Sequence, residues 1–239
     1  MSILVVVIMR ETGMRKIAIS IIMAFVALAL HAGDVATFVN LGFSADGGTF
    51  AFGQYGVTDG DYRAYADIFF VDVAKNDFVK GGKFTASPSA GTAGKDGRGT
   101  FASLQNKAAS LIGTLRVDSS AQGRPLYAQA EDAPSVKDLS FRDFELGREF
   151  TVTLKSLSEG SGTSVRSSFY LVVVIKDANG VERRHTVGLP GFKRAGVKDY
   201  QIRRIITDAS GKSLVFIIEK ELAESRGNSL RFMVETLRL

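Results

Sequence analysis

Polar and aromatic residues gather between two apolar segments in residues 53–67, GQYGVTDGDYRAYAD. Tyr rings combined with amide and carboxylate groups suit contacts with a sugar or a peptide. Asp59 and Asp61 could instead hold Ca²⁺ through their oxygens, although their spacing is not that of an EF-hand. They could also simply cap an ordinary hairpin loop. The candidate ligand-binding residues are Gln54, Tyr55, Asp59, Asp61, Tyr62, Arg63 and Tyr65.

A second candidate surface is basic. Residues 181–204 contain seven Lys and Arg against two acidic residues. Such a concentration of positive charge could contact anionic lipid head groups or acidic glycans. The other interpretation is a solvated outer face of strands. The residues assigned to an anionic contact are Arg183, Arg184, Lys193 and Arg194.

Motifs for catalysis are missing from the sequence. The chain has no Cys and two His, so thiolate chemistry is excluded and His-based metal sites have few ligands. The stretch GTAGKDGRG lacks the Ser or Thr of a phosphate loop, and SEGSGTS lacks the first Gly of a nucleophile elbow. We therefore expect no catalytic residue, metal or cofactor, with one alternative. Paired carboxylates of a glycan hydrolase can come from distant strands, so spacing does not exclude them.

The N-terminus predicts export. Arg15 and Lys16 precede a 14-residue apolar run, and Ala32 follows it. This is the pattern of a secretory signal peptide over residues 1–32, too short for a comfortable membrane span. Met14 resembles a signal-peptide start, so residues 1–13 could be a start-site artefact. The other reading is an uncleaved anchor helix. We expect a periplasmic or secreted protein with no membrane span after cleavage.

The mature chain would carry 27 Lys and Arg against 24 Asp and Glu, about +3. That balance is mildly basic and gives no argument for nucleic acid as a partner. The sequence leaves the oligomeric state open. The expected partners are proteins or glycans of the cell envelope.

Alternating apolar segments that could position these residues fill most of the mature chain. Four short strands with Gly and Asp turns occupy residues 35–86, and a Gly-rich loop over residues 85–100 is expected to be flexible. Helical spacing follows over residues 101–115. Four more strands follow, of which YLVVVI is expected to be central and covered on both faces. Asn179-Gly180 predicts a type I′ hairpin turn.

The two ends of the chain carry similar patterns. ITDASGKSLVFI matches GFSADGGTFAFG at an offset of 164, with Gly211 on Gly47. We predict two copies of one three-strand unit whose apolar residues face one common core. The paired residues are Phe50 with Leu214 and Phe52 with Phe216. Any meander with Asp-Gly turns would look similar, which is the alternative.

Residues 33–79 contain the motifs Gly-Asp-x-Ala (33–36), Phe-Ser-x-Asp-Gly (43–47) and Phe-x-Gln-Tyr-Gly-x-x-Asp-Gly (52–60). Together with the export signal before them, these motifs resemble the start of a family of predicted secreted bacterial proteins of unknown function. The resemblance implies export and a shared fold but no reaction. Gly53 departs from the pattern, where a charged residue is expected. The Ser-x-Asp-Gly hairpin is also similar to the propeller repeats of TolB-type periplasmic proteins. The matching residues are Gly33, Asp34, Ala36, Phe43, Ser44, Asp46, Gly47, Phe52, Gln54, Tyr55, Gly56, Asp59, Gly60 and Tyr65.

These observations predict a mostly β protein of antiparallel meanders, propeller-blade-like or sandwich-like, with one helix after a flexible loop. Residues 33–239 are expected to form a single domain. The expected function is that of an exported, non-enzymatic binding or scaffold protein. The alternative is an envelope glycan hydrolase that uses paired carboxylates.

Overall fold

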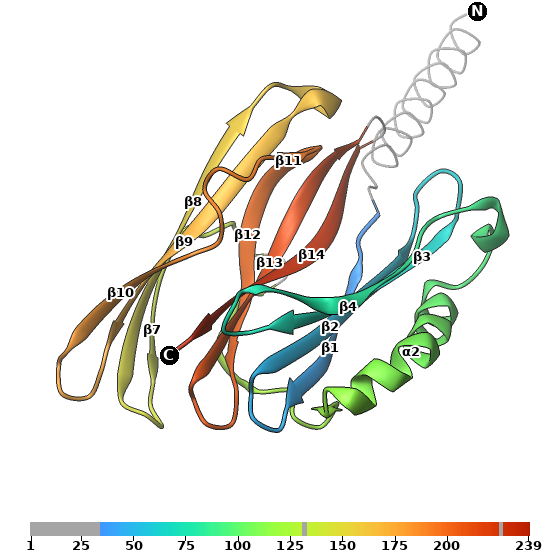
Figure 1. Cartoon of the computed structure of the whole chain (residues 1–239). Coiled ribbons are helices and arrows are strands. Elements are labelled where there is room, and N and C mark those ends of the chain that lie inside the picture. The colour runs from blue at the N-terminus through green and yellow to red at the C-terminus, as the bar shows by residue number, and fades with distance from the viewer. Residues whose placement is uncertain (1–33, 131–132, 225–226) are drawn as a thin grey trace, which may run out of the picture.

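The computed structural model describes residues 34–130, 133–224 and 227–239 (Figure 1). The predicted signal peptide, residues 1–32, lies outside the described residues. The fold class is confirmed: within the described residues the chain is mostly antiparallel β, with a single α-helix, α2 (Gly97–Thr114).

Three antiparallel sheets hold the strands, and we number them by chain order. The first sheet, in the order β4-β3-β2-β1-β5, contains β1 (Thr37–Ser44), β2 (Thr49–Val57), β3 (Ala64–Asp72), β4 (Asp77–Ala86) and β5 (Val117–Asp118). The second sheet, in the order β10-β9-β8-β7, contains β7 (Asp138–Asp143), β8 (Arg148–Glu159), β9 (Arg166–Lys176) and β10 (Glu182–Val187), and β11 (Arg194–Ala195) also pairs with β9. The third sheet, in the order β14-β13-β12-β6, contains β6 (Arg124–Ala128), β12 (Val197–Thr207), β13 (Ser213–Glu224) and β14 (Gly227–Arg238).

The sheets stack in layers: the second sheet, the third sheet, the first sheet and then α2 (Figure 1). Leu171 and Val173 of β9 pack against Phe216 of β13 in the core between the second and third sheets. The opposite face of β13 packs on the first sheet, where Ile217 joins Phe52. The apolar face of α2 covers the outer side of the first sheet. The third sheet is therefore buried on both faces.

The prediction that YLVVVI is covered on both faces is wrong. β9 is an inner strand, but Tyr170, Val172 and Val174 on its outer face are only partly buried. No described layer covers that side. The strand buried on both sides is β13, whose residues 213–219 are all buried. An unbroken apolar run marks a central strand, but it does not show how many layers cover it.

The helix begins earlier than its apolar spacing predicts. Asp96 caps it, since its carboxylate accepts hydrogen bonds from the backbone N–H groups of Arg98 (3.1 Å) and Gly99 (2.9 Å). The predicted loop, residues 85–100, therefore includes the first turn of α2 as well as the 3₁₀ turn η2 (Ala90–Thr92). Its flexibility stays a prediction. A second 3₁₀ turn, η3 (Gly162–Ser164), lies between β8 and β9.

The repeat at the two ends is present in the structure. The meander β1-β2-β3 corresponds to β12-β13-β14, and the two turns have the same construction. Gly47 and Gly211 both take positive φ, +65° and +67°, and each N–H donates to the carbonyl three residues earlier. The β9–β10 turn has this construction too, because Gly180 (φ +82°) donates to the Asp177 carbonyl at 2.9 Å. The predicted type I′ turn is wrong, since Asn179 is not among the residues with positive φ that type I′ requires.

The prediction of one common core for the two repeats is also wrong. Phe50 and Phe52 pack between the first and third sheets, whereas Leu214 and Phe216 face the second sheet. The two copies stack with the same orientation. Equivalent side chains therefore point in the same direction, from the first sheet toward the third and from the third sheet toward the second. The residues that meet Phe52 are Val215 and Ile217. The resulting stack ends at α2, and a propeller-like arrangement is not supported.

Candidate functional site

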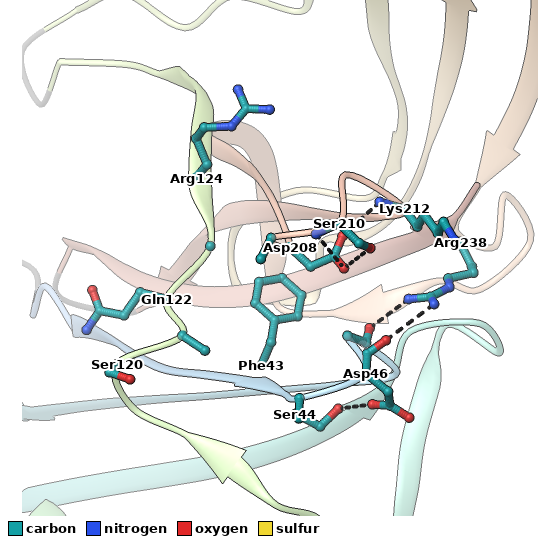
Figure 2. A pocket seen from close by; sticks show the side chains of 15 residues that line it. Phe43, Ser44, Asp46, Ser120, Gln122, Arg124, Asp208, Ser210, Lys212 and Arg238 are labelled. Carbon is teal, nitrogen blue, oxygen red and sulfur yellow. Dashed lines mark hydrogen bonds between the residues drawn. The ribbon is translucent and has the colours of Figure 1, made fainter. Parts of the chain in front are cut away.

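A cavity of about 600 Å³ opens where turns of the first and third sheets lie next to each other (Figure 2). We call it the turn pocket. Three segments distant in sequence build it: the β1–β2 turn, the loop before β6 and the β12–β13 turn. Its lining comprises residues 43–47, 120–124 and 208–210, with Lys212 and Arg238.

The β1–β2 turn is held by its own side chains. Ser44 donates a hydrogen bond to the carboxylate of Asp46 (2.6 Å), and the same carboxylate accepts from the backbone N–H of Gly48 (2.9 Å). These hydrogen bonds hold the pKa of Asp46 below its usual range. The N–H of Thr49 donates to the Ser44 hydroxyl at 2.8 Å. The turn therefore presents a fixed, ionised carboxylate.

The β12–β13 turn repeats this arrangement with the residue types exchanged. Asp208 stands where Ser44 does, and Ser210 stands where Asp46 does. Ser210 donates to the Asp208 carboxylate at 2.5 Å, and the N–H of Ser213 donates to it at 2.7 Å. Asp208 is 5% exposed, so its carboxylate is committed to the turn.

Arg238 ties the two turns together. Its guanidinium donates to the carbonyl oxygens of Gly47 (3.1 Å) and Asp46 (3.3 Å), as Figure 2 shows. It also donates to the hydroxyl of Ser213. A Cβ at Gly47 would lie 2.5 Å from the Asp208 carboxylate, so the close approach of the turns also requires Gly there. The wall between the two sheets is thus preformed.

The third wall is the loop before β6. Asn40 sits at a β-bulge in β1 and donates to the carbonyl of Gln122 at 2.8 Å. Gly42 takes φ +100°, and a Cβ there would lie 1.9 Å from the Asp118 carbonyl oxygen, so only Gly lets this loop approach. Phe43 lies between the segment carrying Gln122 and the turn carrying Asp208 (Figure 2).

The turn pocket keeps both donors and acceptors available. The side chains of Gln122 and Lys212 have no hydrogen bond or ion pair within the described residues. The Ser120 and Ser210 hydroxyls already donate to Asp118 (2.8 Å) and Asp208 (2.5 Å), so they can only accept a further hydrogen bond. Arg124 is held by Asp143 and Glu145 (2.9 and 3.0 Å). Asp208 accepts turn hydrogen bonds on both carboxylate oxygens, and Asp46 accepts two on one oxygen. This arrangement suits the binding of a polar, hydroxyl-rich ligand better than proton transfer.

Two of the predicted ligand-binding residues are buried between the sheets. Gln54 is 4% exposed; its amide nitrogen donates to Asp67 (3.0 Å) and its oxygen accepts from the backbone N–H of Phe232 (2.7 Å). Tyr65 is 4% exposed and donates to Asp34 at 3.2 Å. Burial raises the pKa of Tyr65. Both side chains use their polar atoms to join the first sheet to its neighbours.

The other predicted residues surround the β2–β3 loop. Tyr55 packs on Phe101 of α2, with ring centroids 5.5 Å apart. Asp61 accepts a hydrogen bond from Thr58 and pairs with Arg63 at 3.1 Å. The described residues contain no group of three or more His, Cys, Asp or Glu that could hold a metal ion. Asp59 and Tyr62 are exposed, and ligand binding by this loop stays a prediction.

The four basic residues assigned to an anionic contact do not gather in one patch. Arg183 pairs with Ile175 of β9, whereas Arg194 pairs with Ser167, eight residues away. At about 3.3 Å per residue, the two positions on β9 are roughly 26 Å apart. Arg184 lies on the opposite face of β10 from Arg183. Lys193 pairs with Glu159 (2.6 Å), and Arg194 is partly buried near Glu235 (3.8 Å).

A comparison with protein families decides the classification. The model of the family described as predicted secreted protein (DUF2259) matches residues 51–238. The chain belongs to this family. The family description agrees with the export predicted from residues 1–32. No curated protein and no solved structure is significantly similar to the chain. Within the described residues, no helix has the length and apolar character needed to cross a membrane.

The turn pocket was not predicted from the sequence. Its one available signal was the equivalence of the two turns, which places Gly47 and Gly211 at the same end of their units. Gln122, Arg124 and Arg238 carry no local signal, because the stacking of the sheets brings them there. Residues that are adjacent only through stacking cannot be found from spacing.

Proposed function

We propose that the protein is an exported binding protein that holds a polar ligand, a glycan of the cell envelope, in the turn pocket. The observation that carries this proposal is the preformed wall of two equivalent turns clamped by Arg238. Binding needs no reorganisation of that wall, so little ordering entropy opposes it. The cavity of about 600 Å³ has room for a small oligosaccharide.

The family description supports the export in this proposal and gives no ligand. The amide of Gln122 and the ammonium of Lys212 supply donors for sugar oxygens, and the hydroxyls of Ser120 and Ser210 supply acceptors for sugar hydroxyls. The arrangement of the carboxylates favours binding over hydrolysis, because Asp208 is buried and accepts four hydrogen bonds, and two hydrogen bonds to Asp46 hold its pKa below the usual range.

The test is a binding screen with a steric block. The mature protein is applied to immobilised neutral and acidic oligosaccharides and peptidoglycan fragments, and hits are measured by calorimetry. Ala209 is exposed at the pocket rim, so Ala209→Tyr should weaken binding by at least ~10-fold. Ala109→Tyr, on the exposed face of α2, is the matched control and should bind normally.

Equal binding by Ala209→Tyr and the unmodified protein would overturn the assignment of the pocket. Mass spectrometry of the incubated ligand distinguishes the alternative function. Cleaved glycan would replace the binding proposal with the hydrolase.

A further inference from the structure

A second cavity, about 310 Å³, lies between the β9–β10 turn and the β12–β13 turn. It shares Lys212 and Arg238 with the turn pocket, so the two cavities adjoin along the β12–β13 turn. We call it the basic pocket. The polar side chains that line it are Arg148, Asp177, Arg183, His185, Lys212 and Arg238.

The basic pocket has an excess of positive charge that the protein does not neutralise. Four of its side chains are permanently or ordinarily cationic, against the carboxylate of Asp177 and the main-chain carboxylate of Leu239, which also lines the cavity. Within the described residues, none of Arg148, Arg183, Lys212 and Arg238 forms an ion pair. Like charges around a small cavity repel one another, and an anion placed among them removes that repulsion.

The carboxylate of Asp177 is already in use. It accepts hydrogen bonds from the backbone N–H groups of Asn179 (2.9 Å) and Val181 (3.0 Å), which hold the β9–β10 turn. Arg148 is positioned by a hydrogen bond to the Gly211 carbonyl (2.5 Å), and Arg238 by its contacts with the β1–β2 turn. Arg148 is therefore fixed on the β12–β13 turn and Arg238 on the β1–β2 turn, while the side chains of Arg183 and Lys212 have no hydrogen-bond partner among the described residues.

Because side chains alternate along a strand, Arg183 of β10 faces the cavity and its neighbour Arg184 faces away from it. Arg183 lies opposite Ile175, on the face of the second sheet that turns toward the third sheet, and it lines the cavity. Arg184 lies opposite Val174, on the outer face. The two residues have the same charge and both are exposed, so they form a matched pair.

We infer that the basic pocket binds an oxyanion, the phosphate, sulfate or carboxylate group of a small ligand. Guanidinium groups match such oxygens with paired N–H donors, and Lys212 adds a mobile ammonium. The cavity is at the small end of ligand sites, which fits a single anionic group better than a whole polymer. The ligand can be a free inorganic anion or the charged group of an acidic sugar, and both present the same chemistry.

The experiment titrates the mature protein with inorganic phosphate and with sulfate at constant ionic strength, balanced with sodium chloride. Calorimetry gives the affinity, and thermal melting gives the linked stabilisation. We expect saturable binding that Arg183→Gln weakens by at least ~10-fold, while Arg184→Gln changes it less than ~2-fold. Circular dichroism of both variants checks that they fold.

A second arm compares a uronic-acid oligosaccharide with its neutral counterpart. Tighter binding of the acidic oligosaccharide than of phosphate identifies an acidic sugar as the source of the anion, and equal binding identifies a free anion. Ala209→Tyr should leave phosphate affinity unchanged, which separates this site from the proposed glycan site. Equal losses in Arg183→Gln and Arg184→Gln, or binding that never saturates, would overturn the inference.

Discussion

Asp34 and Arg231 form a two-pronged ion pair that joins the first described residue to the last strand, and one of its two contacts measures 2.9 Å. Arg231 also lies over the ring of Tyr65, 4.1 Å from its centroid. Both charged side chains are largely buried, at 5% and 14% exposure. Backbone bonds between Ala36 and Leu230 (3.0 Å) and between Leu230 and Asp34 (2.8 Å) continue the attachment.

Removal of this carboxylate should destabilise the protein strongly. Asp34→Ala leaves Arg231 buried without its partner and Tyr65 without its acceptor. We expect a loss of about 2–4 kcal/mol in the free energy of unfolding, measured with urea. Asp59→Ala removes an exposed carboxylate and is the control, with a change below about 0.5 kcal/mol. Similar small changes in both variants would show that the ion pair does not hold the N-terminal segment.

The position of Asp34 also bears on export. Asp34 lies one residue beyond the proposed start of the mature chain at Gly33, so cleavage after Ala32 would keep the ion pair between Asp34 and Arg231 in the mature protein. N-terminal sequencing of protein purified from the native host should give Gly33 as the first residue. A chain that still begins at Met1 or Met14 would contradict the signal-peptide prediction.

Gln54 offers a direct choice between a structural and a ligand-binding role. β14 is an edge strand, and Gln54 and Asn76 cover it by accepting hydrogen bonds from Phe232 and Thr236 (both 2.7 Å). Gln54→Leu should cost about 1–3 kcal/mol, because it leaves a backbone N–H and Asp67 without their partner. Gln122→Ala, in the turn pocket, should leave the free energy of unfolding unchanged and weaken ligand binding. A Gln54→Leu variant that keeps its stability and loses ligand binding would instead support the predicted site in residues 53–67.

The sequence predicts more of the local structure than of the packing. Alternation and Gly turns locate the strands of both terminal units, and the equivalence of Gly47 and Gly211 is real, because those signals depend on neighbours in the chain. The interface partner of Phe52 could not be predicted. β13 is apolar on both faces, so its alternation does not tell Ile217 from Phe216. Arg238 reaches the β1–β2 turn only because the sheets stack, so no local sequence pattern predicts this contact.

Asp143 should govern part of the acid stability. It is 1% exposed, and burial alone would raise the pKa of its carboxyl, but the hydrogen bonds from Arg124 and two backbone N–H groups hold that pKa below its usual range. A folded pKa below the unfolded value of about 3.9 gives stability that is fully present above that value and is lost as pH falls through the folded pKa.

Asp143→Asn should therefore be less stable by about 2 kcal/mol at pH 7. The difference from the unmodified protein should shrink below about pH 3, where the native carboxylate is protonated. Urea melts from pH 2 to 7 measure this. Asp138→Asn, at an exposed position of β7, should run parallel to the unmodified protein over the whole range. If the difference in the free energy of unfolding between Asp143→Asn and the unmodified protein stays constant with pH, the ion pair of Asp143 does not cause the loss of stability in acid.

Lys220 should affect the stability of the protein at alkaline pH. Burial, reinforced by the nearby positive charges of Arg194 and Arg231 and opposed by Asp67, lowers the pKa of this Lys to about 8. The folded state then loses the proton before the unfolded state does, so the free energy of unfolding should rise between pH 8 and the ordinary Lys value of about 10.4.

At pH 7 the ammonium of Lys220 is charged in a site that disfavours the charge. Lys220→Met keeps the length of the side chain and removes that cost, so it should stabilise the protein by about 1–2 kcal/mol at pH 7 and abolish the alkaline rise. Lys80→Met, at an exposed position on the edge strand β4, removes the same charge and should do neither. Urea melts at pH 7, 8, 9 and 10 give the comparison. A destabilised Lys220→Met would contradict this prediction, because it would mean that the ammonium makes favourable contacts. An alkaline rise that persists in this variant would show that another group causes it.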